Sequence, residues 1–236
     1  MGTPNVDKRR LIRELTEILS KPIYSLWLMK ANEDAAYRRE FENKVDRLRG
    51  KPGAGKYKIK GPKEFAVEAV DKAFGKRDRP NLLDPVVVKE LKTDRDTLLL
   101  YRMFDGISLK TAVTLGRWWC NRSLLEDICA ATSKLSGTAR ENQILEYMRT
   151  AMFVDPSWNG CTDIAVMKIP AGASLPAIIG RGNWKALKSP AIRTQRDVID
   201  KLRIMPIPGA TQVFVPLVDG MWVDKLVRST SGWPLA

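Results

Sequence analysis

The sequence predicts an α+β fold, in which a helical first part is followed by strands separated by helices and long loops. Two observations lead to this prediction. Apolar residues recur at helical spacing over roughly the first ninety residues, and short apolar or alternating runs closed by glycine and proline follow them. A chain of 236 residues holds one large domain or two small ones, and we expect a helical module over residues 1–92 and a sheet-containing domain over residues 93–236.

The first part is expected to contain several helices. Between residues 6 and 20, Leu11, Leu15 and Leu19 recur at helical spacing, and Pro22 ends the pattern. The other helices predicted here cover residues 23–30, 32–48 and 63–74, with a break rich in glycine, proline and lysine at residues 50–61.

The second part alternates between strand and helix patterns. Arg102 interrupts an otherwise apolar run at residues 97–104, which predicts a buried strand that carries one charge. Residues 162–169 alternate as a strand does, and a Pro-Ala-Gly turn closes them. A proline–glycine turn also leads into a β-branched and aromatic strand at residues 211–215. The remaining elements expected are helices over residues 123–132, 138–152 and 193–202 and a final strand over residues 221–227.

Composition excludes several kinds of chemistry. The chain has no histidine, which removes Ser-His-Asp catalysis, Cys-His catalysis and histidine-based metal sites, and we expect no metal. Cys120, Cys129 and Cys161 have no CxxC spacing, so they fit a reducing compartment better than a disulfide framework. No apolar run reaches the roughly 18 residues of a membrane span. No secretory signal peptide is visible at the start, so export would use another route.

The formal net charge of +13 suggests an anionic partner, such as nucleic acid, an acidic protein or a phosphorylated ligand. Basic side chains gather between residues 44 and 63, where Asp46 is the sole acid. The candidates for contact with nucleic acid in this stretch are Lys51, Lys56, Lys58 and Lys60. The alternative is a solvated linker whose like charges repel one another.

Arg102 is a candidate site residue because of its surroundings. An arginine in an apolar strand needs a partner, since an unpaired buried charge is costly. That partner is either a carboxylate of the core or a phosphate of a ligand. The planar guanidinium group can bind a phosphate through two hydrogen bonds at once. Both alternatives fit the sequence.

Two adjacent tryptophans follow Gly116 and Arg117. In a strand, the rings of Trp118 and Trp119 face opposite ways, so one ring can pack in the core while the other lines a pocket for an adenine or nicotinamide ring. Core packing of both rings is the alternative. Cys120 has no base nearby in the sequence to lower its pKa, so we interpret it as a small pocket residue and not as a nucleophile.

Gln212 stands at the start of the strand predicted at residues 211–215, where most other side chains are apolar. Alternation with period two puts Gln212 and Phe214 on one face and Val213 and Val215 on the other. An uncharged donor and acceptor in this place is suited to a sugar hydroxyl or an amide. The alternative is a glutamine on an edge strand that faces water.

Five short segments carry a resemblance to a known family. They are Tyr101-Arg102, Gly116-Arg-Trp-Trp-Cys120, Ile169-Pro-Ala-Gly172, Ile179-Gly180 and Pro208-Gly-Ala-Thr-Gln212-Val-Phe-Val-Pro216. Their order resembles the toxin domains of the ADP-ribosyltransferase-like superfamily that bacterial polymorphic and type VI secretion effectors carry. It is most similar to the NAD(P)+ glycohydrolase branch of that superfamily. The resemblance covers about residues 97–227 and leaves out the helical first part.

The resemblance implies that residues 93–236 form an ADP-ribosyltransferase-like split β-sheet domain with helical insertions, and that NAD or NADP is the substrate. The residues that would bind it are Tyr101, Arg102, Trp118, Trp119 and Cys120. Arg102 would hold the phosphates and ribose. Gln212 would occupy the position that is glutamate in the transferases and often glutamine in the glycohydrolases. This chain departs from the family pattern at Cys120, where serine or threonine is usual, and at Ala210, where glycine is usual.

On this resemblance we expect an NAD(P)+-consuming toxin that cleaves the nicotinamide–ribose bond in the cytoplasm of a competitor cell, and an immunity protein that neutralises it in the producer. Arg102 and Gln212 would be the catalytic residues. Histidine is not needed, because nicotinamide leaves readily and an oxocarbenium-like transition state calls for positioning and charge complementarity. The alternatives are an ADP-ribosyltransferase that modifies RNA or an acidic protein, and a non-enzymatic protein that binds nucleic acid through its basic stretch.

Overall fold

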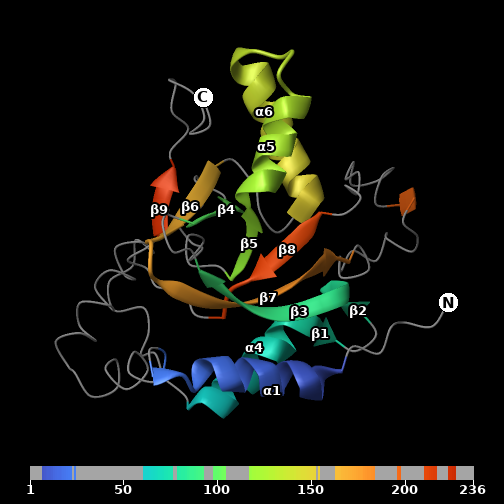
Figure 1. Ribbon diagram of the computed structural model, residues 1–236. Helices are drawn as coiled ribbons and strands as arrows, with labels where there is room; N and C mark the ends of the chain where they lie inside the picture. The colour runs from blue at the N-terminus through green and yellow to red at the C-terminus, as the bar shows by residue number, and fades with distance from the viewer. Residues whose placement is uncertain are drawn as a thin grey trace, which may run out of the picture.

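Helices and antiparallel strands combine in this protein, which agrees with the predicted α+β class (Figure 1). The computed structural model describes residues 7–22, 24, 61–76, 79–92, 98–104, 117–152, 154, 163–183, 196–197, 210–216 and 223–226. The two helices of the first part lie together beside one end of a large sheet, and the two helices of the second part stand side by side near its middle.

The large sheet has seven strands in the order β3-β7-β8-β5-β4-β6-β9. All of its neighbouring strands pair in antiparallel fashion. Its strands are β3 (Leu82–Lys92), β4 (Leu98–Phe104), β5 (Trp118–Asn121), β6 (Asp163–Ile169), β7 (Ser174–Gly182), β8 (Thr211–Phe214) and β9 (Val223–Leu226). A separate two-stranded ribbon is made of β1 (Gly75–Lys76) and β2 (Arg79–Pro80).

Helices α1 (Lys8–Leu19) and α4 (Pro62–Phe74) cover the β3–β7 end of the sheet. The Asp7 side chain accepts hydrogen bonds from the main-chain N–H groups of Arg9 and Arg10, which starts α1. Proline stands in the first turn of α4, where its missing N–H costs nothing. The helix ends at Gly75, whose φ of 63° suits glycine.

Helices α5 (Arg122–Ala131) and α6 (Gly137–Met152) form a pair that packs against β4 and β5. Asn121, the last residue of β5, starts α5 directly, because its side chain accepts a hydrogen bond from the main-chain N–H of Leu124. The sheet therefore passes into the helical pair without a loop, and this fixes where α5 begins relative to Cys120.

Two hydrophobic clusters correspond to the two helical pairs. In the first cluster, side chains of α1 and α4 such as Leu15 and Val70 pack with sheet residues that include Trp119. In the second cluster, side chains of α5 and α6 such as Leu125 and Met148 pack with a further set from the sheet. Both helical pairs thus contribute to burying the same sheet.

Most of the predicted elements are confirmed within a few residues of their expected bounds. These are α1, α4, β4, α5, α6, β6, β8 and β9. Residues 196–197 are helical, in agreement with the helix predicted over 193–202. Apart from Tyr24, the helices predicted over residues 23–30 and 32–48 lie outside the described residues.

The interpretation of residues 1–92 as a helical module does not hold for residues 82–92. They form β3, an 11-residue strand that pairs with β7. Pro85 interrupts the strand pattern in the sequence, because proline is rarely found within a strand. In the structure it lies where the pairing register shifts between Leu83 and Val87. The boundary expected between residues 92 and 93 consequently falls between two strands of one sheet, and α1 shares its hydrophobic cluster with that sheet.

Candidate functional site

Three of the strands that carry predicted site residues are neighbours in the sheet, in the order β8-β5-β4. The register of β4 and β5 pairs Tyr101 with Cys120. Successive side chains of a strand point to opposite faces. Tyr101 and Cys120 therefore share one face of the sheet, and Arg102 and Trp119 share the other.

Gln212 lies on the face opposite to Arg102. The register of β5 and β8 pairs Trp119 with Val213, so Gln212 shares the face of Cys120. The sequence predicts that Arg102 and Gln212 act together on one ligand. In this conformation the sheet separates them, and such a joint site is not formed.

The Gln212 side chain is buried, with 6% of its surface exposed. Its Nε2 donates a hydrogen bond to the main-chain oxygen of Met152, the last residue of α6, at 2.7 Å. Strand β8 lies between β7 and β5, so the alternative of an edge-strand glutamine that faces water is wrong. In this position, Gln212 connects the sheet to the end of α6.

Cys120 and Tyr101 lie in the second hydrophobic cluster, among side chains of α5 and α6. Cys120 is fully buried, its Sγ lies 3.9 Å from the Met148 Sδ, and burial raises the pKa of its thiol to about 12. Burial and the raised pKa both disfavour a thiolate at Cys120 in the folded protein. The Tyr101 hydroxyl is also buried, has no hydrogen-bond partner in the described part of the chain, and has a pKa raised by burial.

The two tryptophans differ in exposure, as the sequence predicts for adjacent positions of a strand. Trp119 is fully buried in the first hydrophobic cluster, and its indole Nε1 has no hydrogen-bond partner among the described residues. Trp118 is partly exposed and packs edge-on against Phe214, with ring centroids 5.0 Å apart and planes at 68°. Trp118 therefore offers a more accessible ring than Trp119.

Arg102 is partly buried between two buried neighbours, Tyr101 and Met103. It pairs across the sheet with Ala165 of β6, and its Nε and Nη1 atoms are buried. The prediction of a buried strand that carries one charge is confirmed. Arg102 brings a guanidinium group, with donors and no acceptor, to the face that Trp119 also occupies.

The basic candidates Lys51, Lys56, Lys58 and Lys60 lie outside the described residues. Within the described ranges, no group of three or more cysteine, aspartate or glutamate side chains is placed to hold a metal ion. The described helices also include none that is long and apolar enough to cross a membrane.

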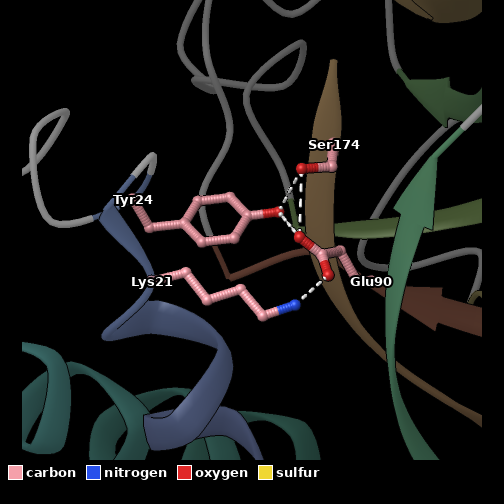
Figure 2. A network of polar contacts seen from close by, with 4 residues as sticks. All are labelled: Lys21, Tyr24, Glu90 and Ser174. Carbon is pink, nitrogen blue, oxygen red and sulfur yellow. Dashed lines mark hydrogen bonds and ion pairs between the residues drawn. The ribbon is translucent and has the colours of Figure 1, made fainter. Parts of the chain in front are cut away.

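A polar cluster that the sequence analysis did not identify joins α1 to the sheet (Figure 2). It consists of Lys21 and Tyr24 at the end of the first helical segment, Glu90 of β3 and Ser174 of β7. The sequence contains a weak signal, because Lys89 and Glu90 interrupt the apolar pattern between Val86 and Leu91. Its partners come from distant parts of the chain, and spacing alone does not indicate them.

Comparisons with known proteins give no relative for this chain. No family model matches it, no curated protein matches its sequence, and no solved structure matches its fold.

Proposed function

We propose that this protein cleaves the bond between nicotinamide and ribose in NAD+ or NADP+ and acts as a toxin that depletes the dinucleotide in a competitor cell. The observation that carries the proposal is the adjacency of β4, β5 and β8. These strands hold the Tyr-Arg, Trp-Trp-Cys and Gln segments on which the resemblance rests, although the segments are far apart in the sequence.

Arg102 is the residue that we propose to contact the substrate. Its guanidinium group carries a fixed positive charge and planar donors, chemistry that suits the pyrophosphate of a dinucleotide, and its Nε and Nη1 atoms are buried in this conformation. It is only partly buried, whereas Tyr101, Trp119 and Cys120 are almost fully buried. The tryptophan on the same face as Arg102 is the buried Trp119, whereas the more accessible ring of Trp118 lies on the opposite face with Gln212, so we assign neither ring as a wall for a planar base.

Gln212 takes a different role in this proposal. Its amide is bound to the main-chain oxygen of Met152, on the face opposite to Arg102. We propose that Gln212 is a positioning residue, which fixes β8 against α6 and so holds β5 and β4 in place. The reaction needs no general acid, because the pyridinium ring leaves as neutral nicotinamide, and water adds to the ribose carbon with release of one proton.

An assay with purified full-length chain tests the proposal. NAD+ and NADP+ are incubated with wild-type protein, Arg102→Ala and Arg122→Ala, and free nicotinamide and ADP-ribose are measured by chromatography. Arg122 is a matched control, because it is an exposed arginine of α5 that pairs with Glu126 at 2.6 Å. Turnover by wild type and Arg122→Ala, lost in Arg102→Ala, would support the proposal. Turnover that survives Arg102→Ala would overturn the site.

The net charge of +13 favours one second candidate, an ADP-ribosyltransferase that modifies RNA or an acidic protein. The same assay separates the two when it is repeated with cellular RNA and with protein. Release of nicotinamide without an acceptor indicates hydrolysis, whereas release only with an acceptor that becomes labelled indicates transfer. No turnover in either case would turn attention to the third possibility, salt-dependent binding of nucleic acid without catalysis. For the toxin, a cognate immunity protein in the producing cell is part of the proposal.

A further inference from the structure

The polar cluster of Lys21, Tyr24, Glu90 and Ser174 joins three elements (Figure 2). Lys21 and Tyr24 follow α1, Glu90 lies on β3, and Ser174 is the first residue of β7. The Lys21 ammonium pairs with Glu90 Oε2. At the other carboxylate oxygen, Oε1, the Tyr24 hydroxyl lies at 2.9 Å and the Ser174 hydroxyl at 3.1 Å, and the two hydroxyl oxygens are 2.7 Å apart. Every contact in the cluster except that between the two hydroxyls involves Glu90.

The ion pair with Lys21 favours an ionised Glu90. Tyr24 and Ser174 each have one hydroxyl hydrogen, so together they fill two of the three contacts among their oxygens and Glu90 Oε1, while Oε2 accepts from Lys21. A proton added to Oε2 would meet the Lys21 ammonium. A proton on either oxygen also removes the negative charge with which Lys21 is paired. Protonation of Glu90 therefore removes the ion pair that joins Lys21 to β3.

The hydrogen bonds and the charge around Glu90 also favour its ionised form. Burial raises the pKa of Glu90, but the hydrogen bonds from Lys21, Tyr24 and Ser174 and the charge of Lys21 outweigh it, so the pKa lies below its ordinary value of 4.5. On β3 itself, Lys92 lies two residues along on the same side and is exposed, and the charge that acts on Glu90 is that of Lys21. A lowered pKa means that the cluster stabilises the fold above pH 4.5 and that this stabilisation is lost as the pH falls through the lowered value.

The start of α1 is held by different interactions. The Lys8 ammonium pairs with Asp71 of α4 at 3.3 Å, and the Arg10 guanidinium donates to the main-chain oxygen of Val86 at 3.1 Å. Leu11 and Leu15 are fully buried in the first hydrophobic cluster. None of these contacts involves Glu90, so loss of the Glu90 contacts affects the far end of the helix first.

We propose that Glu90 is the centre of an acid-sensitive clasp, which holds the segment after α1 on the β3–β7 edge at neutral pH and releases it when the carboxylate is protonated. The device is local. Acid loosens the segment of Lys21 and Tyr24 that follows α1, while the α5–α6 pair and the helix itself, whose Leu11, Leu15 and Leu19 are fully buried, stay folded. This inference is independent of the proposed enzymatic function, because none of the four residues belongs to the Arg102 region.

Hydrogen exchange of main-chain amides, read as protection factors between pH 7 and pH 3.5, tests the clasp on the full chain. In wild-type protein we expect protection of the Ser20, Lys21 and Tyr24 amides to fall as the pH drops below 4.5 towards the lowered pKa, by up to about tenfold at pH 3.5. Amides of α6 serve as the internal reference and should keep their protection. Glu90→Gln should show low protection at the end of α1 already at pH 7, with no further acid response.

Asp71→Asn is the matched control, because it breaks an exposed ion pair at the other end of α1 and should keep the wild-type acid response. Lys21→Met provides a second variant if Glu90→Gln fails to fold, and it should reduce protection of the same amides at pH 7. The clasp is refuted if Glu90→Gln or Lys21→Met retains the wild-type profile. Loss of protection in α6 at the same pH as in α1 would also refute it, because the transition would then be global.

Discussion

The Gln212 amide donates a hydrogen bond to the main-chain oxygen of Met152 at 2.7 Å, and both residues are almost fully buried. Met152 ends α6, and the carbonyl groups in the last turn of a helix have no partner within that helix. Gln212 supplies one such partner from the middle of the sheet. A glutamine that looks like a ligand-binding residue in the sequence thus fixes a helix end in the structure.

Replacement of Gln212 by alanine is expected to destabilise the fold by about 1–3 kcal/mol, because the Met152 oxygen loses its donor in a buried place. Glutamate at this position should cost more, since a carboxylate would face the carbonyl oxygen. Urea unfolding measures both effects. Gln143→Ala, a partly exposed glutamine of α6, is the control and should change stability by less than about 0.5 kcal/mol. Loss of NAD+ cleavage in Gln212→Ala with an unchanged unfolding midpoint would instead favour direct contact with substrate.

Substitution of Arg102 separates charge from geometry in the proposed site. We expect Arg102→Ala to lower kcat/KM for NAD+ by about a hundredfold or more, as loss of a donor to a charged transition state typically does. Lysine keeps the charge but loses the planar pair of donors, so Arg102→Lys should retain an intermediate activity with a raised KM. Steady-state kinetics gives both values. Equal activities of Arg102→Lys and wild type would exclude bidentate hydrogen bonding of Arg102 to the pyrophosphate.

Much of the fold was predictable because its elements carry local signals. Leucines at helical spacing indicate α1, and the uninterrupted apolar run before Arg102 indicates β4. Strand β3 was missed, because Pro85 and the charged residues near its end obscure the β-branched run at Val86–Val88. Its partner β7 was recognised only as a short motif at Ile179-Gly180. Both strands depend on pairing between residues that are far apart in the sequence, and a local sequence pattern does not reveal such pairing.

The candidate site was less predictable for a similar reason. The segments that carry the resemblance lie on β4, β5 and β8, which are neighbours in the sheet. Their sequences did not indicate which face each side chain occupies relative to the others, because the face depends on the pairing register. The register puts Arg102 and Gln212 on opposite faces. The Glu90 cluster was missed altogether, since its partners Lys21 and Ser174 are far away in the sequence.

Cys120 should be chemically inert in the native protein. With a pKa raised to about 12 by burial, only about one thiol in ten thousand is ionised at pH 8. Treatment with iodoacetamide at pH 8, followed by peptide mass spectrometry, should therefore leave Cys120 unmodified until urea unfolds the chain. Cys129 is partly exposed and serves as the comparison, with faster modification in the native state. Equal rates for the two thiols would mean that the α5–α6 pair opens readily or does not cover Cys120.

The hydrophobic cluster beneath β3 and β7 predicts that α1 and the sheet unfold together. Leu15 is fully buried in this cluster, so Leu15→Ala should destabilise the protein by about 2–5 kcal/mol. Helix loss, followed by far-UV circular dichroism, and the fluorescence of the seven tryptophans, to which the buried Trp119 contributes, should have the same midpoint in urea. Glu17→Ala, an exposed change on the same helix, is the control and should leave that midpoint nearly unchanged.

A fragment of residues 93–236 tests the same relationship without a point mutation. It lacks β3, so β7 would become an edge strand with unpaired main-chain groups, and the side chains of the sheet that face α1 and α4 would be exposed. We expect this fragment to be unfolded or aggregated, whereas the complete chain under the same conditions is folded and monodisperse. A fragment that gives a cooperative unfolding transition would show that the division at residues 92 and 93 separates two independent domains after all. The strand pairing between β3 and β7 argues for the first result, because it joins the two parts through main-chain hydrogen bonds as well as through the shared core.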